Sequence, residues 1–156
     1  MNEPKVITRS AAGYDQDFYA WSVEQAARLR RSRPSDVDWE NVAEEVETLG
    51  KSDRRKVASD LKNILEHLIK WRYQPQKRTT GWRSSIREHR DRIQRIIADS
   101  PSLRRLPYEI LAEEYRKARG AALDDTKLPK ERVPETCPFA IEDVLDPTYW
   151  PEAEPG

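Results

Sequence analysis

The feature that most constrains this chain is an amphipathic pattern between Ser52 and Trp71. Apolar residues recur there at spacings of three and four, which is typical of one face of a helix. They are Val57, Leu61, Ile64, Leu65, Leu68 and Ile69. This stretch gives the clearest helix that the sequence predicts.

Four further segments share the helical period, and each is expected to be a separate helix. They are residues 14–33, 35–49, 82–96 and 107–118. No stretch shows the period-two alternation of a strand bounded by turn residues. The sequence therefore predicts an all-α bundle of about five helices.

Prolines and glycines predict where these helices end. Gly50 is expected to act as a left-handed cap that closes the second helix, whose start is marked by Ser35 and Asp38 in capping-box spacing. Pro75 and Gly81 interrupt the next pattern. The third and fourth helices are therefore predicted to form an antiparallel hairpin joined at residues 74–81.

The last part of the chain has a different composition. Five prolines between residues 128 and 151 exclude a long helix, yet large apolar residues gather between Phe139 and Trp150. We expect residues 124–156 to be an extended, Pro-rich segment that packs on a bundle of residues 14–123 and is pinned by Trp150. Residues 1–13 are expected to be an N-terminal extension.

Composition restricts the class of protein. Lys+Arg and Asp+Glu are 28 each and the pI is near 6.8, whereas a dedicated nucleic-acid domain often has a pI above about 9. Cys137 is the only cysteine, which excludes an internal disulfide and a cysteine-cluster metal site. No apolar run suggests a signal peptide or a membrane span. We expect a cytoplasmic protein without a membrane partner or a cofactor.

A basic stretch runs through the predicted hairpin at residues 70–95. It has nine Lys and Arg against Glu88 and Asp91, interleaved with aromatic residues, as in surfaces that bind phosphates and stack on bases. The candidate nucleic-acid-binding residues are Trp82, Arg83, Arg87 and Arg90. The alternative is internal, because acids of the second helix and of the C-terminal segment could neutralise this charge.

Carboxylates on the second helix suggest a different chemistry. Glu44 and Glu47 share a helical face, and with His67 they are the candidate catalytic residues of a metal-dependent hydrolase. The motif of all-α nucleotide pyrophosphohydrolases is incomplete, however, and neither histidine stands in Glu-x-x-His spacing. We therefore predict no metal site. A solvated acidic face is the favoured interpretation, and His89 is expected to be a hydrogen-bonded residue between helices.

Ordered blocks of the sequence carry a resemblance to a known family. They include DWENVAEEVETLG, HLIKW followed by YQP, GWRSSIREHR and CPFAIEDVLD followed by YWPE. Over about residues 14–152 the chain resembles the bacterial domain-of-unknown-function family number twenty-nine. The resemblance implies an all-α fold and a cytoplasmic bacterial origin, and it implies no activity. Within its blocks, Glu44, Glu47, His67 and Trp82 are least explained by structure alone.

The function favoured by the sequence is a non-enzymatic interaction or regulatory module. Its partner is expected to be a protein that the sequence does not identify, and association of identical chains stays open. The two alternatives are a nucleic-acid binder that uses the basic hairpin and a hydrolase that uses the helix carboxylates.

Overall fold

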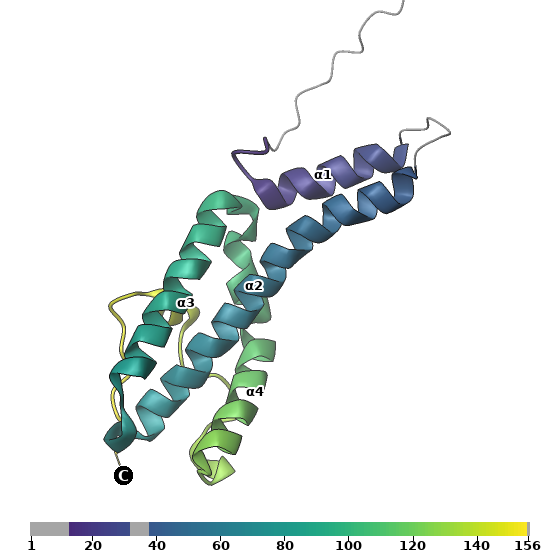
Figure 1. Cartoon of the computed structure of the whole chain (residues 1–156). Helices are drawn as coiled ribbons and strands as arrows, with labels where there is room; N and C mark the ends of the chain where they lie inside the picture. The colour runs from purple at the N-terminus through teal and green to yellow at the C-terminus, as the bar shows by residue number, and fades with distance from the viewer. Residues whose placement is uncertain (1–12, 32–37, 156) are drawn as a thin grey trace, which may run out of the picture.

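The computed structural model describes residues 13–31 and 38–155, and its regular elements are all helical (Figure 1). The α-helices are α1 (Phe18–Arg31), α2 (Trp39–Tyr73), α3 (Thr80–Asp99), α4 (Leu106–Thr126) and α5 (Ile141–Leu145). Three 3-10 turns lie between them: η1 (Pro75–Lys77), η2 (Pro101–Arg105) and η3 (Lys130–Arg132). The predicted all-α fold class is confirmed. None of the helices in these ranges is long and apolar enough to span a bilayer.

The predicted break at Gly50 is wrong, because the second and third predicted helices are one helix. α2 continues through Gly50 for 35 residues, and no described glycine has a positive φ. The glycine serves close packing instead. A Cβ at this position would lie 2.0 Å from Ser22 Oγ and 3.1 Å from Tyr19 Cδ2. Gly50 therefore lets α1 approach the backbone of α2.

Polar side chains fix the starts of the long helices. Asp38 Oδ1 accepts a hydrogen bond from the Asn41 backbone N–H at 3.2 Å, so Asp38 caps α2. Ser35, the other residue of the predicted capping box, lies outside the described residues. Thr79 caps α3 in the same way, accepting from the Trp82 N–H at 3.1 Å. Each cap satisfies a backbone donor that the first turn leaves unpaired.

The core lies where the second half of α2 meets α3 and α4. Of the stripe predicted from the sequence, Leu61 to Ile69 are fully buried there, together with Ile86 and Ile93 of α3 and Tyr115, Ala118 and Ala122 of α4, while Val57 is buried in a smaller cluster. Burial of one Leu or Ile side chain contributes about 1.5–3 kcal/mol. α2 and α3 are joined by the short connection through η1 and lie side by side in Figure 1. The predicted hairpin is thereby confirmed.

The C-terminal segment adds apolar side chains to the same core. Val133, Phe139, Ile141 and Val144 are buried in it, and the Trp150 ring lies 4.8 Å from the Trp71 ring. Backbone carbonyl groups of the segment also accept hydrogen bonds from side chains of the bundle. Arg119 of α4 donates through Nε to the Val133 carbonyl at 2.9 Å. The segment is part of the packed structure.

α1 and the first half of α2 form a separate feature, which we call the arm: α1 together with residues 39–54. In Figure 1 these two helices extend side by side away from the bundle of α2, α3 and α4. Small residues form the contact, since Ser22 and Ala26 of α1 and Ala43 and Gly50 of α2 are buried. The arm is therefore held by close backbone approach and not by a layer of large apolar side chains.

The arm contact predicts opposite effects for two Gly→Ala substitutions. Alanine favours a helix by about 1 kcal/mol over glycine, but overpacking costs about 1–3 kcal/mol. Gly50→Ala is expected to lower the free energy of unfolding by about 1 kcal/mol, because the added methyl displaces the Ser22 side chain. Urea denaturation followed by circular dichroism measures this change.

Gly120→Ala is the matched control. Gly120 lies inside α4, and an added Cβ meets nothing within 4 Å. This substitution is expected to raise the free energy of unfolding by up to about 1 kcal/mol. Equal stabilisation by both substitutions would show that the arm tolerates a wider spacing of its helices.

Candidate functional site

The proposed hydrolase residues do not meet in one site. Glu47 pairs with Arg30 of α1 at 2.7 Å and with Lys51 at 3.4 Å, and the hydrogen bond from Arg30 lowers the pKa of Glu47. Glu44, on the same helix, is exposed. His67 follows Glu47 by 20 residues on α2, which separates them by about 30 Å at 1.5 Å per residue.

The geometry therefore corrects the expectation that Glu44, Glu47 and His67 could share an ion within one chain. Ligands of one metal have to lie within about 2–2.6 Å of a single point. His67 Nδ1 instead lies 2.8 Å from the Asn63 carbonyl oxygen of the preceding turn. Within the described ranges, no group of three His, Cys, Asp or Glu residues is placed to hold a metal ion.

The basic hairpin differs from the expected phosphate-binding surface because Arg90 is buried. Its side chain is only 2% exposed, and Nε donates to the Val144 carbonyl oxygen at 2.8 Å. Nη2 lies 3.4 Å from the Asp143 carbonyl oxygen, so Arg90 binds the last turn of α5. Burial lowers the pKa of Arg90 to about 10. Arg90 is therefore not available to a nucleic acid in this structure.

The ring of Trp150, in the C-terminal segment, contacts a second arginine of this surface, the exposed Arg83. The Arg83 guanidinium carbon lies 5.3 Å from the Trp150 ring centroid, and that of Arg90 lies 5.5 Å from it. Arg83 also stands over Trp71, at 5.5 Å. Cation–π contacts of this kind contribute about 0.5–2 kcal/mol each. Of the predicted nucleic-acid-binding residues, Arg87 is exposed and Trp82 is half-buried.

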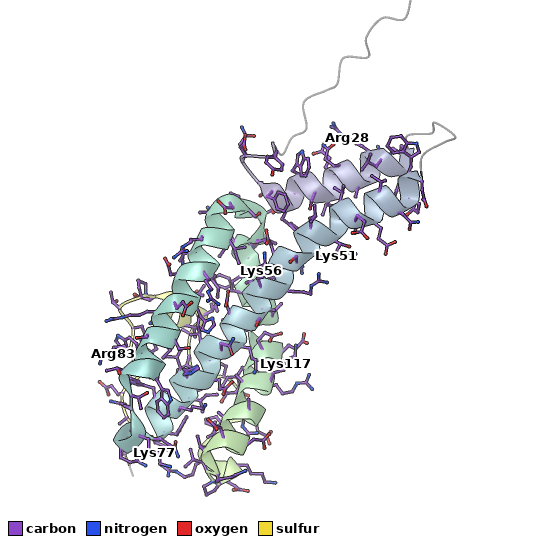
Figure 2. The ribbon with its side chains drawn as sticks, viewed as in Figure 1. Arg28, Lys51, Lys56, Lys77, Arg83 and Lys117 are labelled. Atoms are coloured by element: carbon purple, nitrogen blue, oxygen red, sulfur yellow. The ribbon has the colours of Figure 1, made fainter. Side chains whose placement is uncertain are left out.

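The remaining basic residues of the hairpin mostly have partners nearby. Arg92 pairs with Glu88 and Arg95 with Asp91, each one helical turn away on α3. The buried Lys70 of α2 pairs with Glu66 and with Asp125 of α4. Figure 2 shows side chains of both charge signs distributed along these helices. Ion pairs thus hold three of the nine cations, Lys70, Arg92 and Arg95. Glu66 and Asp125 are the acids from outside the stretch that take part, so a local excess of positive charge remains.

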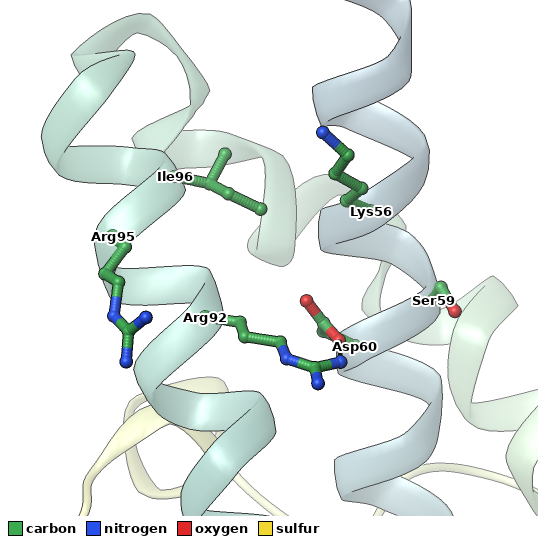
Figure 3. A pocket seen from close by; sticks show the side chains of 6 residues that line it. All are labelled: Lys56, Ser59, Asp60, Arg92, Arg95 and Ile96. Atoms are coloured by element: carbon green, nitrogen blue, oxygen red, sulfur yellow. Dashed lines mark ion pairs between the residues drawn. The ribbon is translucent and has the colours of Figure 1, made fainter.

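A polar pair joins α2 to α3 in the middle of the bundle. His89 Nδ1 lies 2.7 Å from Asp60 Oδ1, which confirms the prediction of a hydrogen-bonded histidine between helices. Asp60 is only 6% exposed. It lines a pocket of about 500 Å³ between the two helices, whose other walls are Lys56, Ser59, Arg92, Arg95 and Ile96 (Figure 3). This pocket combines one buried carboxylate with three cations.

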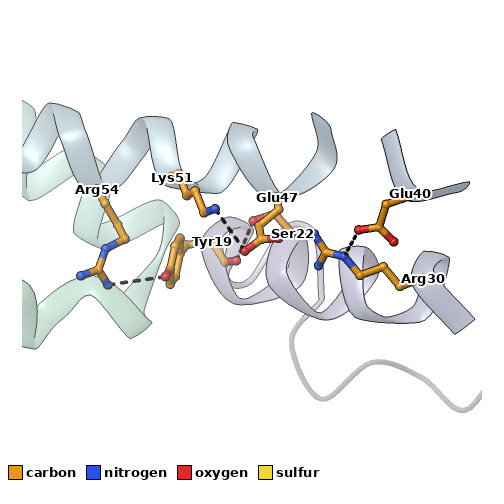
Figure 4. A network of polar contacts seen from close by, with 7 residues as sticks. All are labelled: Tyr19, Ser22, Arg30, Glu40, Glu47, Lys51 and Arg54. Atoms are coloured by element: carbon orange, nitrogen blue, oxygen red, sulfur yellow. Dashed lines mark hydrogen bonds and ion pairs between the residues drawn. The ribbon is translucent and has the colours of Figure 1, made fainter. Parts of the chain in front are cut away.

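The arm carries a second candidate surface. Along one edge of the arm, Arg30 of α1 binds two glutamates of α2, Glu40 at 3.0 Å and Glu47 (Figure 4). A different face of α2 carries Val42, Val46 and Leu49 at helical spacing, and these residues line a groove of about 390 Å³ with Asp38, Asn41 and Glu45. Leu49 is 55% exposed. An exposed apolar face of this kind on a projecting pair of helices is a candidate interaction site.

Hydrogen bonds tie the base of the arm to the bundle. Asp17 Oδ2 accepts from the Ser102 backbone N–H at 2.6 Å, and Asp17 Oδ1 from the Ser102 hydroxyl at 2.9 Å. The Tyr19 N–H donates to Ser100 Oγ at 3.0 Å. Tyr19 also packs against the small buried cluster of Val57, Leu103 and Leu106. The arm therefore has a defined orientation at its junction with the bundle.

Sequence reasoning missed the role of Asp60 and the exposed stripe of the arm. The sequence did indicate that Asp60 is buried, because this residue stands three residues after Val57 and four before Ile64, on the buried face of the predicted helix. A carboxylate at that position needs a polar partner. Val42, Val46 and Leu49 gave no such signal, because the same spacing describes a buried face equally well.

Comparisons with known proteins agree with this architecture. The family model described as domain of unknown function DUF29 matches residues 14–150. An alpha-helical protein of unknown function from Rhodospirillum rubrum has a similar structure, with 25% sequence identity and a TM-score of 0.73; the match covers 90% of this chain and 93% of that chain. No curated protein matches the chain. The resemblance noted from the sequence is confirmed, and it brings no activity with it.

Removing the C-terminal segment tests how it relates to the bundle and to the basic surface. Deletion of residues 131–156 takes Val133, Phe139, Ile141 and Val144 from the core, at about 1.5–3 kcal/mol each. At about 2–4 °C per kcal/mol, Tm is expected to fall by 10 °C or more in differential scanning calorimetry.

A milder variant separates stability from charge. Trp150→Ala leaves these core residues in place and frees the exposed Arg83 from its contact with the Trp150 ring, so affinity for heparin is expected to rise at low salt. Trp150→Phe keeps an aromatic ring there and serves as the control. Unchanged heparin affinity in Trp150→Ala would show that Arg83 does not contribute to a polyanion surface.

Proposed function

We propose that this chain, which belongs to the family of the domain of unknown function DUF29, is a non-enzymatic interaction module that acts through its arm. The observation that carries the proposal is the apolar stripe of Val42, Val46 and Leu49, of which Val42 and Leu49 are exposed and Val46 is half-buried. The occupant of this face is a second copy of the chain. A cytoplasmic setting is part of the proposal, since the lone Cys137 needs no oxidising compartment.

A second hollow follows the groove along α2. One helical turn after Leu49, Asp53 lines it together with Tyr14, Phe18, Asp15 and Asp99. Beside it the rings of Tyr14, Phe18 and Trp21 contact one another, with centroids 4.9–5.9 Å apart. The apolar groove is thus followed by a hollow that is acidic as well as aromatic, at the start of α1.

The arm also needs additional apolar cover. Its two helices meet through Ser22, Ala26, Ala43 and Gly50, which bury little apolar area, whereas Val42 and Leu49 remain in water. Two amphipathic helices reach a common stable arrangement when a second pair completes a four-helix bundle. Pairing of two arms would bury the apolar side chains that the single arm leaves exposed.

Charge supports a second copy as the occupant. α1 has Arg28, Arg30 and Arg31 against Glu24, whereas residues 39–49 of α2 have four glutamates and no base. A twofold interface brings the same patch together from both chains, so a self-complementary patch has to carry both signs. Within one chain Arg28 binds Glu24, and Arg30 binds Glu40 and Glu47. If α1 of one arm lies along α2 of the other, the exposed Arg31 approaches the acidic rim of the groove at Asp38 and Glu45.

The size of the face sets the expected affinity. Sixteen residues of α2 span about 24 Å and two helices about 20 Å in width, so each arm offers about 500 Å². Stable interfaces bury about 800 Å² per partner. The arm dimer is therefore expected to be weak, with a Kd of about 10–100 μM.

Sedimentation equilibrium over a range of protein concentrations tests the proposal. The wild-type chain is expected to dimerise reversibly in the range given above. Leu49→Gln, which places an amide in the apolar face, is expected to raise the Kd at least tenfold, because loss of one buried Leu costs more than 1.4 kcal/mol.

Tyr108→Gln is the matched control, since Tyr108 is a similarly exposed apolar residue on α4, outside the arm. Its dimerisation is expected to equal that of the wild type. A wild-type chain that remains monomeric up to about 1 mM, or a Tyr108→Gln variant as impaired as Leu49→Gln, would contradict a dimer formed through the arm.

A further inference from the structure

We propose that the pocket between α2 and α3 binds a small phosphate ester that carries a hydroxyl group, such as a sugar phosphate. The pocket has a volume of about 500 Å³ and is lined by Lys56, Ser59, Asp60, Arg92, Arg95 and Ile96. Ligand sites for small molecules have volumes of about 300–1,000 Å³. The pocket lies in the bundle beyond the arm, and its ligand is independent of the proposed self-association.

Three cations line this pocket from two helices: Lys56 of α2, and Arg92 and Arg95 of α3. In Figure 3, Arg92 points across to α2, whereas the Arg95 guanidinium lies on the side of α3 that faces away from α2. Arg92 extends toward Asp60, with Nη1 3.8 Å from Oδ1. An ester phosphate placed between the helices would meet positive charge on both sides.

The present partners of these cations hold them weakly. Lys56 pairs with Asp53, Arg92 with Glu88 and Arg95 with Asp91, each within one turn of its own helix. The three basic side chains are 49–73% exposed. Exposed pairs of this kind contribute little to stability, whereas a hydrogen bond to a charged ligand group contributes several times more. A phosphate can therefore recruit the cations at small cost.

Asp60 supplies the preference for a hydroxyl group. Its Oδ1 is bonded to His89 Nδ1 and lies near Arg92, while among the described residues Oδ2 accepts no hydrogen bond. An ionised carboxylate can only accept, so His89 donates and Oδ2 stays free for a ligand donor. A carboxylate so placed disfavours a bare phosphate and favours an ester whose hydroxyl reaches it.

The carbon skeleton of such a ligand also has a place to lie. Ile96 and the aliphatic stems of Lys56, Arg92 and Arg95 form the apolar part of the pocket wall. A sugar ring offers apolar C–H faces and several hydroxyl groups in a body small enough for this volume. The pocket therefore has a counterpart for each part of a sugar phosphate.

Isothermal titration calorimetry of the full chain with ribose 5-phosphate at low salt tests the assignment. Binding is expected for the ester, while ribose and inorganic phosphate each bind at least tenfold more weakly. Arg92→Gln is expected to weaken binding of the ester about tenfold, the equivalent of one charge-assisted hydrogen bond. The Arg92 side chain is 49% exposed, so this change leaves the fold intact.

Arg104→Gln is the control, since Arg104 is an exposed arginine of η2 outside the pocket. It is expected to bind ribose 5-phosphate as the wild type does. An equal loss in both variants, or no heat at about 10 mM ester, would overturn the site. Inorganic phosphate binding as tightly as the ester would overturn the role assigned to Asp60.

Discussion

The length of α2 determines the shape of this protein. Its 35 residues span about 52 Å, whereas α3 with 20 and α4 with 21 residues span only about 30–32 Å. About 20 Å of α2 therefore extends beyond the bundle, and α1 is the helix that covers it. The arm, its small-residue contact and its exposed stripe all follow from this mismatch in length.

Hydrophobic periodicity predicted most of the bundle, because apolar residues that are three or four positions apart lie on one face of a helix and can be buried together. It did not distinguish a glycine that ends a helix from one that admits another helix. The neighbours of Gly50 in sequence suit a helix cap. In the structure, however, the glycine makes room for Ser22, a residue 28 positions earlier in the chain. Long-range packing of this kind leaves no local pattern, so the arm was divided wrongly.

The candidate sites were predicted less well, for an electrostatic reason. A count of charges along the chain gives their sum and does not give their partners. Arg90 contributed to the basic stretch in sequence, yet its guanidinium binds carbonyl groups of residues 143 and 144. Conversely, Glu44 and His67 fall in blocks shared with the family, but a continuous α2 separates them. Only the three-dimensional fold reveals that Asp60 of α2 lies opposite Arg92 of α3 in a pocket.

The arm is suited to binding because it is braced before any partner arrives. Three hydrogen bonds link its base at Asp17 and Tyr19 to residues 100–102, and Val57 anchors α2 in the small cluster below. Ordering of loops and side chains is a major cost of association. A surface on two helices with a fixed base avoids much of that cost. An interface of modest area can therefore retain measurable affinity, provided that its apolar centre around Leu49 stays intact.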